Sequence, residues 1–230
     1  MTHNISLPPA LVAMARAMRG GRERLVERVD PARLAHVVID LQNGYMEEGA
    51  PLEVPMARAI VPAVNRLSAA VRAAGGTNIF IRYTMYPDAV DDWSTWHREH
   101  NAPAGLEGTL ATFSPGAHHW QLWPGLDVGE GDLIAEKQRF SAFTPGTSDL
   151  EGILRARGID TLIITGTMTN VCCESTARDA MQRNYRVLFA SDATAAWSDE
   201  AHNASLANIC MVFGDVMTVD EIIALTQQGL

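Results

Sequence analysis

The chain has few of the features that mark a secreted or membrane protein. Only three of its 230 residues are cysteines, and Cys172 and Cys173 are adjacent, so they form no disulfide framework and favour a reducing cytoplasm. No hydrophobic run approaches the ~18 residues of a membrane span. The apolar stretch Leu7–Met18 is followed, not preceded, by positive charges, which is unlike a signal peptide. We therefore expect a cytoplasmic protein.

Positive charge is also scarce. The 18 Lys and Arg residues face 27 Asp and Glu residues, and the net charge of −9 argues against nucleic acid or an anionic membrane as a partner. No Gly-x-Gly-x-x-Gly run follows the first expected strand, which argues against dinucleotide binding. A hydrophobic content of 47% suits a globular chain with an ample core.

Two segments are expected along the chain. Residues 1–30 form an arm, in which Pro8-Pro9 starts a short amphipathic helix and Gly20-Gly21 ends it. This arm either frays or packs against a partner subunit. Residues 31–230 form the main domain.

Within this domain, short apolar and β-branched runs alternate with helical patterns. The expected strands are 35–41, 78–83, 132–136, 161–165, 186–190 and 211–213, and the expected helices are 54–74, 150–157, a helix from 171, 201–209 and 218–227. This alternation predicts an α/β fold, with three α/β/α layers and a mainly parallel, doubly wound sheet. Residues 84–130 are rich in Trp, His, Pro and Gly and are interpreted as an insert that supplies specificity.

Cys172 is placed where a reactive thiol would be expected. It directly follows a buried strand and lies in the first turn of a helix, for which Thr169 or Asn170 is the expected N-cap. A helix N-terminus favours the thiolate, and its free N–H groups can hold an oxyanion. The alternative is that Cys172 and Cys173 are small buried core residues.

An acid and an amine accompany this thiol. Asp40 ends the first expected strand and Lys137 follows the third, and the carboxyl ends of parallel strands meet in one crevice. Separately, each residue could be a turn cap or a solvated side chain. Together they predict a cysteine hydrolase in which Asp40 takes the thiol proton, Lys137 stabilises the thiolate, and Cys172 attacks a carbonyl.

Three motifs carry a family resemblance. Val-Ile-Asp-Leu-Gln-Asn (38–43), Glu-Lys-Gln-Arg-Phe-Ser-Ala-Phe (136–143) and Gly-Thr-Met-Thr-Asn-Val-Cys-Cys-Glu-Ser-Thr-Ala-Arg-Asp (166–179) resemble the isochorismatase-like cysteine hydrolases, and the resemblance runs from about residue 35 to the C-terminus.

The resemblance implies a catalytic triad of Asp40, Lys137 and Cys172 and an oxyanion hole formed by the amides of Met168 and Cys172. It also implies a non-proline cis peptide between Thr167 and Met168, and a homo-oligomer, either a dimer or a tetramer. We expect no metal and no organic cofactor, because the triad needs neither.

Within the family the chain looks most like the ureidoacrylate and N-carbamoyl amidohydrolases, with which it shares Tyr45 and the run after Met168. The resemblance implies a cysteine-dependent amidohydrolase that cleaves a C–N bond of a small amide, ureido or carbamoyl substrate through a thioester. The alternatives are an isochorismatase-type vinyl-ether hydrolase, which needs no thiol, and a catalytically silent ligand- or partner-binding module of the same fold.

The expected substrate-binding residues are Tyr45, Arg82, Tyr83, Phe140 and Trp93. Arg82 would pair with a substrate carboxylate or, alternatively, with a surface acid. Phe140 stands where ureidoacrylate enzymes carry a tyrosine, and this predicts a substrate with a larger apolar or aromatic portion.

Histidines are concentrated in the same insert. The pairs His97/His100 and His118/His119 admit a metal-binding interpretation, but they equally suit solvated or pocket-lining side chains, and no metal site is expected.

Overall fold

A six-stranded parallel sheet forms the centre of the molecule in the computed structural model, which describes residues 2–228. Residue 1 of the expected arm and residues 229–230 of the expected domain lie outside the described residues. The strand order is β3-β2-β1-β4-β5-β6. The strands are β1 (Leu34–Ile39), β2 (Thr77–Tyr83), β3 (Leu133–Lys137), β4 (Thr161–Thr167), β5 (Arg186–Ala195) and β6 (Asp215–Met217).

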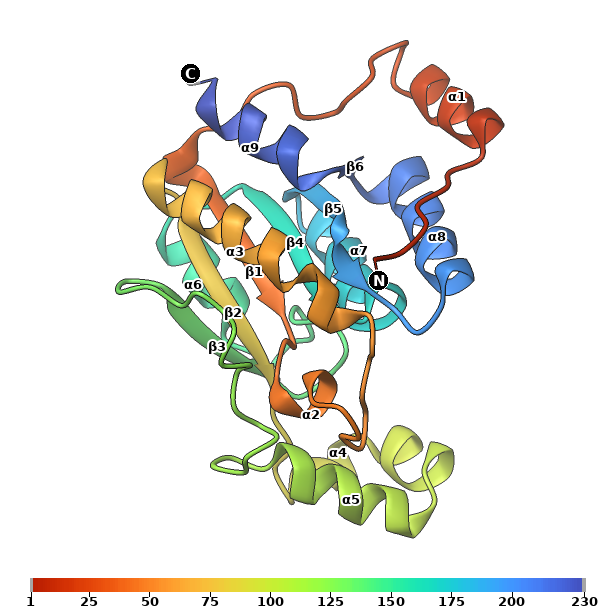
Figure 1. Cartoon of the computed structure of the whole chain (residues 1–230), viewed down its shortest axis with the longest axis vertical. Coiled ribbons are helices and arrows are strands. Elements are labelled where there is room, and N and C mark those ends of the chain that lie inside the picture. The colour runs from red at the N-terminus through yellow and green to blue at the C-terminus, as the bar shows by residue number, and fades with distance from the viewer. Residues whose placement is uncertain (1, 229–230) are drawn as a thin grey trace.

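Helices cover both faces of this sheet (Figure 1). The α-helices are α1 (Pro9–Met18), α2 (Asn43–Met46), α3 (Ala57–Ala73), α4 (Ala89–Asp92), α5 (Pro103–Phe113), α6 (Leu150–Ala156), α7 (Glu174–Gln182), α8 (Asp199–Asn208) and α9 (Val219–Gln227). A core on one face joins α3 and α9 to the sheet, and a second core on the other face joins α6, α7 and α8. The predicted three-layer, doubly wound α/β fold is confirmed. No helix within residues 2–228 is both long enough and apolar enough to span a membrane.

The register of β1 determines where the polar side chains at the strand ends lie. Every residue of β1 is buried, because helices cover both of its faces. Ile39 pairs with Ile81 of β2 on one side and with Gly166 of β4 on the other. The strand order reverses between β1 and β4, and ligands of open parallel sheets bind at such a switch point.

Gly166 permits the close approach of β4 to β1. Its φ is +112°, and a Cβ built there would lie 2.0 Å from the carbonyl oxygen of Ile39. A side chain would therefore push the two central strands apart at the switch point. The pairing of β4 with β5 also shifts register between Ile164 and Gly166.

The last expected strand is misplaced. Residues 211–213 lie in a π-helical turn, Ile209–Phe213, which continues α8. The last strand of the sheet is instead β6, which begins at Asp215. The amide of Gly214 donates to the carbonyl of Ile209 and ends the turn. The prediction was wrong because a short apolar run has the same composition in a buried strand and in a buried helical turn.

The N-terminal arm (residues 2–30) packs on its own domain. The imidazole of His3 stacks on that of His202 with ring centroids 4.1 Å apart, and Arg19 pairs with Asp215 at 2.7 Å. The helix α1 begins at Pro9 and ends before Gly20, as predicted. The described part of the arm is therefore docked on its own domain, and its contact with a partner subunit stays a prediction.

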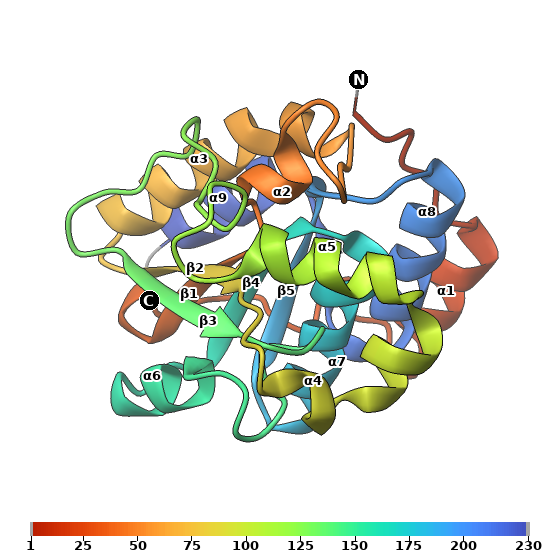
Figure 2. The ribbon, with the colours of Figure 1, turned by 90° about the horizontal axis from the view of Figure 1, so that it is seen from below.

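The insert covers the carboxyl ends of the strands. Figure 1 shows α4 and α5 below the sheet, and Figure 2 shows them in front of it when the molecule is seen from below. A Cβ at Gly44 in α2 would lie 2.8 Å from the ring of Phe113 in α5. The insert thus packs directly on the helix that follows β1.

Candidate active site

Three buried side chains meet below the switch point. The Nζ atom of Lys137 lies 2.7 Å from Oδ2 of Asp40 and donates a hydrogen bond to Sγ of Cys172 at 3.3 Å. Asp40 and Lys137 are both 0% exposed. Lys137, the only lysine in the sequence, also donates to the carbonyl of Arg139 at 3.1 Å. The acid, amine and thiol that the sequence placed at strand ends therefore form one contiguous cluster.

A tight turn after β1 aims the carboxylate of Asp40. Its φ of 54° lies in the left-handed region, which Asp tolerates better than most residues. Its amide donates to the carbonyl of Ile81 at 3.1 Å. The side chain of Gln42 then bonds both the N–H and the C=O of Tyr83, at 2.7 and 3.0 Å. The turn is thereby tied to the end of β2.

Burial dominates the electrostatics of the cluster. It raises the pKa of Cys172 to about 12, although the charge of Lys137 opposes the shift. Burial also raises the pKa of Asp40, again against Lys137. Burial alone would lower the pKa of Lys137, but the neighbouring Asp40 and Cys172 raise it above its ordinary value.

Burial thus opposes ionisation of the Cys172 thiol, and the ammonium of Lys137 opposes that effect. The role of Lys137 as the group that stabilises the thiolate stays a prediction. A carboxylate with a raised pKa is, however, a better acceptor for the thiol proton.

The turn that carries Cys172 differs from the expected capped helix. Residues Thr169–Cys173 form a π-helical turn before α7, and its N-cap is Met168, without a side-chain cap. The hydroxyl of Thr169 instead pairs with Nδ1 of His202 at 2.9 Å. The carbonyl of Met168 accepts from the amides of Val171 and Cys173, each at 3.1 Å. Cys172 still lies in the first helical turn, and the predicted cis peptide between Thr167 and Met168 is present.

A small cavity of about 80 Å³ opens onto Cys172. Three of the expected substrate-binding residues line it, namely Tyr45, Tyr83 and Phe140. The insert adds Trp96 and Asn101, which the sequence reasoning did not place there. The concentration of aromatic side chains in residues 84–130 was the available signal, but it did not distinguish Trp96 from its neighbours.

Two expected substrate-binding residues lie outside this lining. Arg82 pairs with Glu136 at 3.1 Å, and its guanidinium lies 3.6 Å from the centroid of the Trp120 ring. The cause is the sheet register, which sets Arg82 opposite Glu136 on β3. Trp93 packs edge-on behind Phe140, with ring centroids 4.8 Å apart.

A larger cavity lies elsewhere in the molecule. It measures about 650 Å³ and its lining includes Arg19 and Asp215, between the N-terminal arm and β6. No residue of the Asp40–Lys137–Cys172 cluster lines it. We place the candidate active site at the smaller cavity, because it is lined by Cys172, whose sulfur contacts the ammonium of Lys137.

Comparison with known proteins agrees with this geometry. Residues 34–221 match the family model described as the isochorismatase domain. The chain is 34% identical over 209 residues to the ureidoacrylate amidohydrolase RutB of Pseudomonas savastanoi pv. phaseolicola, covering 84% of each chain. It is 35% identical over 205 residues to RutB of Klebsiella pneumoniae, covering 83% of this chain and 85% of that one.

Solved structures show the same likeness. A crystal structure of a cysteine hydrolase from Pseudomonas syringae pv. phaseolicola 1448A has a TM-score of 0.79 at 30% identity, over 90% of this chain and 98% of that one. N-carbamoylsarcosine amidase from Thermoplasma acidophilum has a TM-score of 0.64 at 25% identity, over 82% and 97% of the two chains. With its fold, its cluster of acid, amine and thiol, and its matched domain, the chain belongs to the isochorismatase family of hydrolases.

Proposed function

We propose that this protein is a cysteine-dependent amidohydrolase that cleaves the C–N bond of a small amide, ureido or carbamoyl substrate. The single observation that carries this proposal is the position of Lys137, whose Nζ bridges Asp40 at 2.7 Å and Cys172 at 3.3 Å. The amidohydrolase names of the related RutB proteins support the same bond type.

The first half of the reaction acylates the thiol. Asp40 accepts the proton of Cys172 while Lys137 stabilises the sulfur anion, and the sulfur attacks the substrate carbonyl carbon. The resulting oxyanion is held by the backbone amides of Met168 and Cys172. When the C–N bond breaks, Asp40 returns the proton to the leaving nitrogen, and a thioester remains on Cys172.

The second half releases the acyl group. Asp40 removes a proton from a water molecule, which attacks the thioester carbonyl. The C–S bond then breaks, the sulfur regains its proton, and the carboxylic or carbamic acid leaves. The raised pKa of Asp40 suits a group that gives and takes a proton in both halves.

Two other functions fit less well. A vinyl-ether hydrolase needs no thiol, whereas here Cys172 lines the cavity and contacts the ion pair. A silent binding module has no use for a buried ion pair, which costs several kcal/mol of desolvation per ion. Both alternatives leave Cys172 without a role.

The cavity favours an uncharged substrate group. Tyr45, Tyr83, Phe140 and Trp96 surround it, and no arginine or lysine is among the described residues that line it. At about 80 Å³ it is smaller than the ~300–1,000 Å³ of typical ligand sites. It therefore accommodates the reacting group, and a larger apolar portion of the substrate requires the insert to part from Phe140.

The acyl intermediate provides the direct test. A rapidly quenched reaction with an N-carbamoyl substrate should add the acyl mass to the peptide that contains Cys172, and the Cys172→Ala variant should show neither adduct nor ammonia release. Ammonia release from Cys172→Ala at the wild-type rate would contradict the mechanism.

Substrate choice is tested separately. We expect kcat/KM for an uncharged N-carbamoyl compound with an apolar portion to exceed that for ureidoacrylate, and Phe140→Tyr to shift the ratio toward ureidoacrylate. Preference for ureidoacrylate by about tenfold, or ~1.4 kcal/mol, would contradict the assignment from the pocket. Dimer or tetramer formation stays a prediction, to be checked by light scattering, as does a cytoplasmic location.

A further inference from the structure

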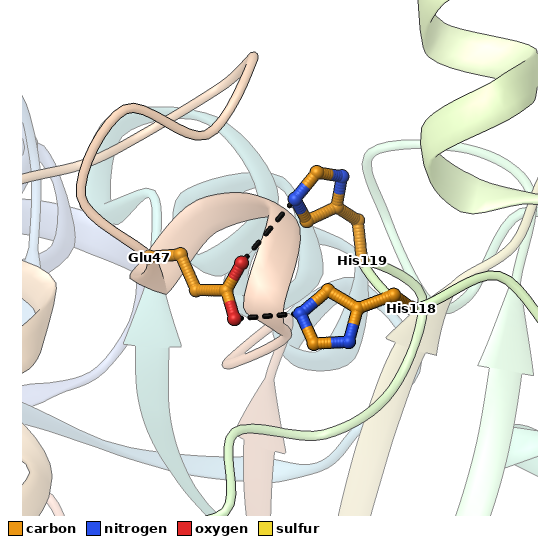
Figure 3. Close-up of side chains that lie close together, drawn as sticks. All are labelled: Glu47, His118 and His119. Carbon is orange, nitrogen blue, oxygen red and sulfur yellow. Dashed lines mark hydrogen bonds and ion pairs between the residues drawn. The ribbon is translucent and has the colours of Figure 1, made fainter.

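One group of side chains outside the cavity has the spacing of metal ligands among residues 2–228. It consists of Glu47, His118 and His119, whose ligand atoms all lie within 4.8 Å of one another. Figure 3 shows both imidazoles pointing at the same carboxylate. Nε2 of His118 lies 2.6 Å from Oε1 of Glu47, and Nε2 of His119 lies 3.3 Å from Oε2.

The backbone holds these three residues in place. The amide of Gly44 donates to the carbonyl of His119 at 2.9 Å, and the side-chain amide of Asn43 donates to the carbonyl of His118 at 3.0 Å. These bonds join the segment that carries His118 and His119, here called the histidine loop, to α2. Glu47 directly follows α2. The ligand atoms are therefore presented from two segments in fixed register, and little chain ordering is needed for binding.

The chemistry of the donors indicates which ion would bind. Two imidazole nitrogens and one carboxylate oxygen form a donor set that zinc uses when a coordination position is left for water. Tetrahedral zinc with bonds of ~2.0–2.1 Å separates its ligand atoms by about 3.3 Å. The side chain of His118 is 68% exposed, so water can reach the fourth position.

We propose that Glu47, His118 and His119 bind a divalent transition metal, with Zn²⁺ as the ion that fits best. This site differs from the sequence expectation of no metal and lies outside the Asp40–Lys137–Cys172 cluster. The metal contacts no reacting group. It joins the histidine loop to α2 and thereby steadies Tyr45, two residues before Glu47, in the wall of the cavity.

The simplest alternative is a carboxylate that accepts hydrogen bonds from two imidazoles and binds no metal. The two possibilities differ in stoichiometry, in ligand dependence and in stability. A metal that binds only the folded state stabilises it by an amount that grows with the logarithm of one plus the ratio of metal concentration to Kd and so raises the melting temperature, whereas the hydrogen-bonded arrangement does not respond to metal.

Titration of the metal-free protein with Zn²⁺ and Co²⁺ tests the proposal. We expect one equivalent to bind with a Kd in the micromolar range or tighter. Glu47→Gln, His118→Asn and His119→Asn should each weaken binding by roughly tenfold or more. His100→Asn, a change at an exposed histidine of the same insert, should bind as the wild type does. Zn²⁺ should raise the melting temperature of the wild type and of His100→Asn but not of His118→Asn.

The Co²⁺ spectrum separates this site from the cysteines. Nitrogen and oxygen ligands give weak visible bands without thiolate charge transfer, and this is the expected result. A strong thiolate band, unchanged affinity in all three ligand variants, or the absence of any binding would each overturn the proposal. Circular dichroism of the metal-free variants verifies that each is folded before titration.

Discussion

Strand β1 and the residue directly after it carry two fully buried polar side chains with different roles, His36 and Asp40. His36 lies between two hydroxyl groups, with Nε2 2.8 Å from Oγ1 of Thr165 and Nδ1 3.2 Å from Oγ of Ser68. Burial lowers its pKa to about 3, so the ring is neutral. Asp40, which lies after the end of β1, faces the ammonium of Lys137 instead.

The difference between the two sites lies in charge and access. Both ring nitrogens of His36 are paired and the side chain is 0% exposed, so this cluster behaves as well-packed core. The Asp40–Lys137 pair holds two charges away from water, a costly arrangement, and a cavity opens beside it at Cys172. A neutral buried cluster supports the fold, whereas a charged one next to a cavity supplies reactive groups.

The sharpest way to test the comparison is to remove the nucleophile. We expect Cys172→Ala to lower kcat by at least ~10⁴-fold, as loss of a nucleophile does in other hydrolases. Cys173 is buried in the core with Sγ 3.8 Å from the carbonyl of Thr165, and Cys173→Ala should retain most activity. Equal losses in steady-state assays of the two variants would mean that the wrong sulfur has been assigned.

Removing the positive charge should have the next largest effect. Lys137→Met is expected to cut kcat/KM by more than a hundredfold, ~3 kcal/mol in the barrier, with the fold preserved. Since Lys137 opposes the burial that raises the pKa of Cys172, its loss should raise that pKa further and slow alkylation near neutral pH. An alkylation profile identical to the wild type would remove Lys137 from its role at the sulfur.

The neutral cluster of His36, Thr165 and Ser68 should affect the free energy of unfolding but not kcat. Burial holds the pKa of His36 below its unfolded value of 6.5, at about 3. The contribution of the neutral ring to the free energy of unfolding is therefore fully present above pH 6.5 and is lost as the pH falls toward 3. The loss over the whole window is on the order of 3–5 kcal/mol. His36→Gln should flatten this dependence in urea unfolding while kcat stays unchanged. His202, whose pKa burial lowers to about 4, contributes equally in both proteins.

Neither cluster should depend on metal for its function, which makes chelation the mildest perturbation. We expect exhaustive chelator treatment to leave kcat unchanged, because the proposed thiol chemistry uses no metal ion. KM is the parameter that would respond if the Glu47 site steadies Tyr45. Loss of kcat that added zinc restores would move the metal into the reaction itself.

The alternation of strand and helix patterns was sufficient to predict the layers and the residues at the strand ends. Burial on both faces gives parallel strands a continuous apolar run, which is a strong signal. The strand expected at 211–213 shows the limit of that signal, because three apolar residues do not report backbone conformation. Strand register was equally inaccessible, so the sequence left open whether Arg82 pairs with a substrate carboxylate or with an acid of the protein, and the structure pairs it with Glu136 across the sheet.

The cavity lining and the state of the thiol depend on tertiary contacts. Trp96 lies at the cavity beside Phe140, with ring centroids 5.0 Å apart, a long-range contact with no local sequence pattern. Cys172 lies in the first helical turn, as the sequence predicted, although the expected N-cap does not form. The sequence did not report the burial of Cys172, which raises the pKa of its thiol. Local sequence thus specified the position of Cys172, whereas the direction of its pKa shift depends on the packing around it.

The burial of the only lysine has a practical consequence for chemical labelling. Lys137 is 0% exposed, so amine-directed acylating reagents have no accessible lysine side chain in the native protein. Acylation of Lys137 requires the site to open, and each such event adds a single, countable mass increment to one known peptide. The chain therefore contains its own reporter of active-site opening, which mass spectrometry can follow without any introduced label.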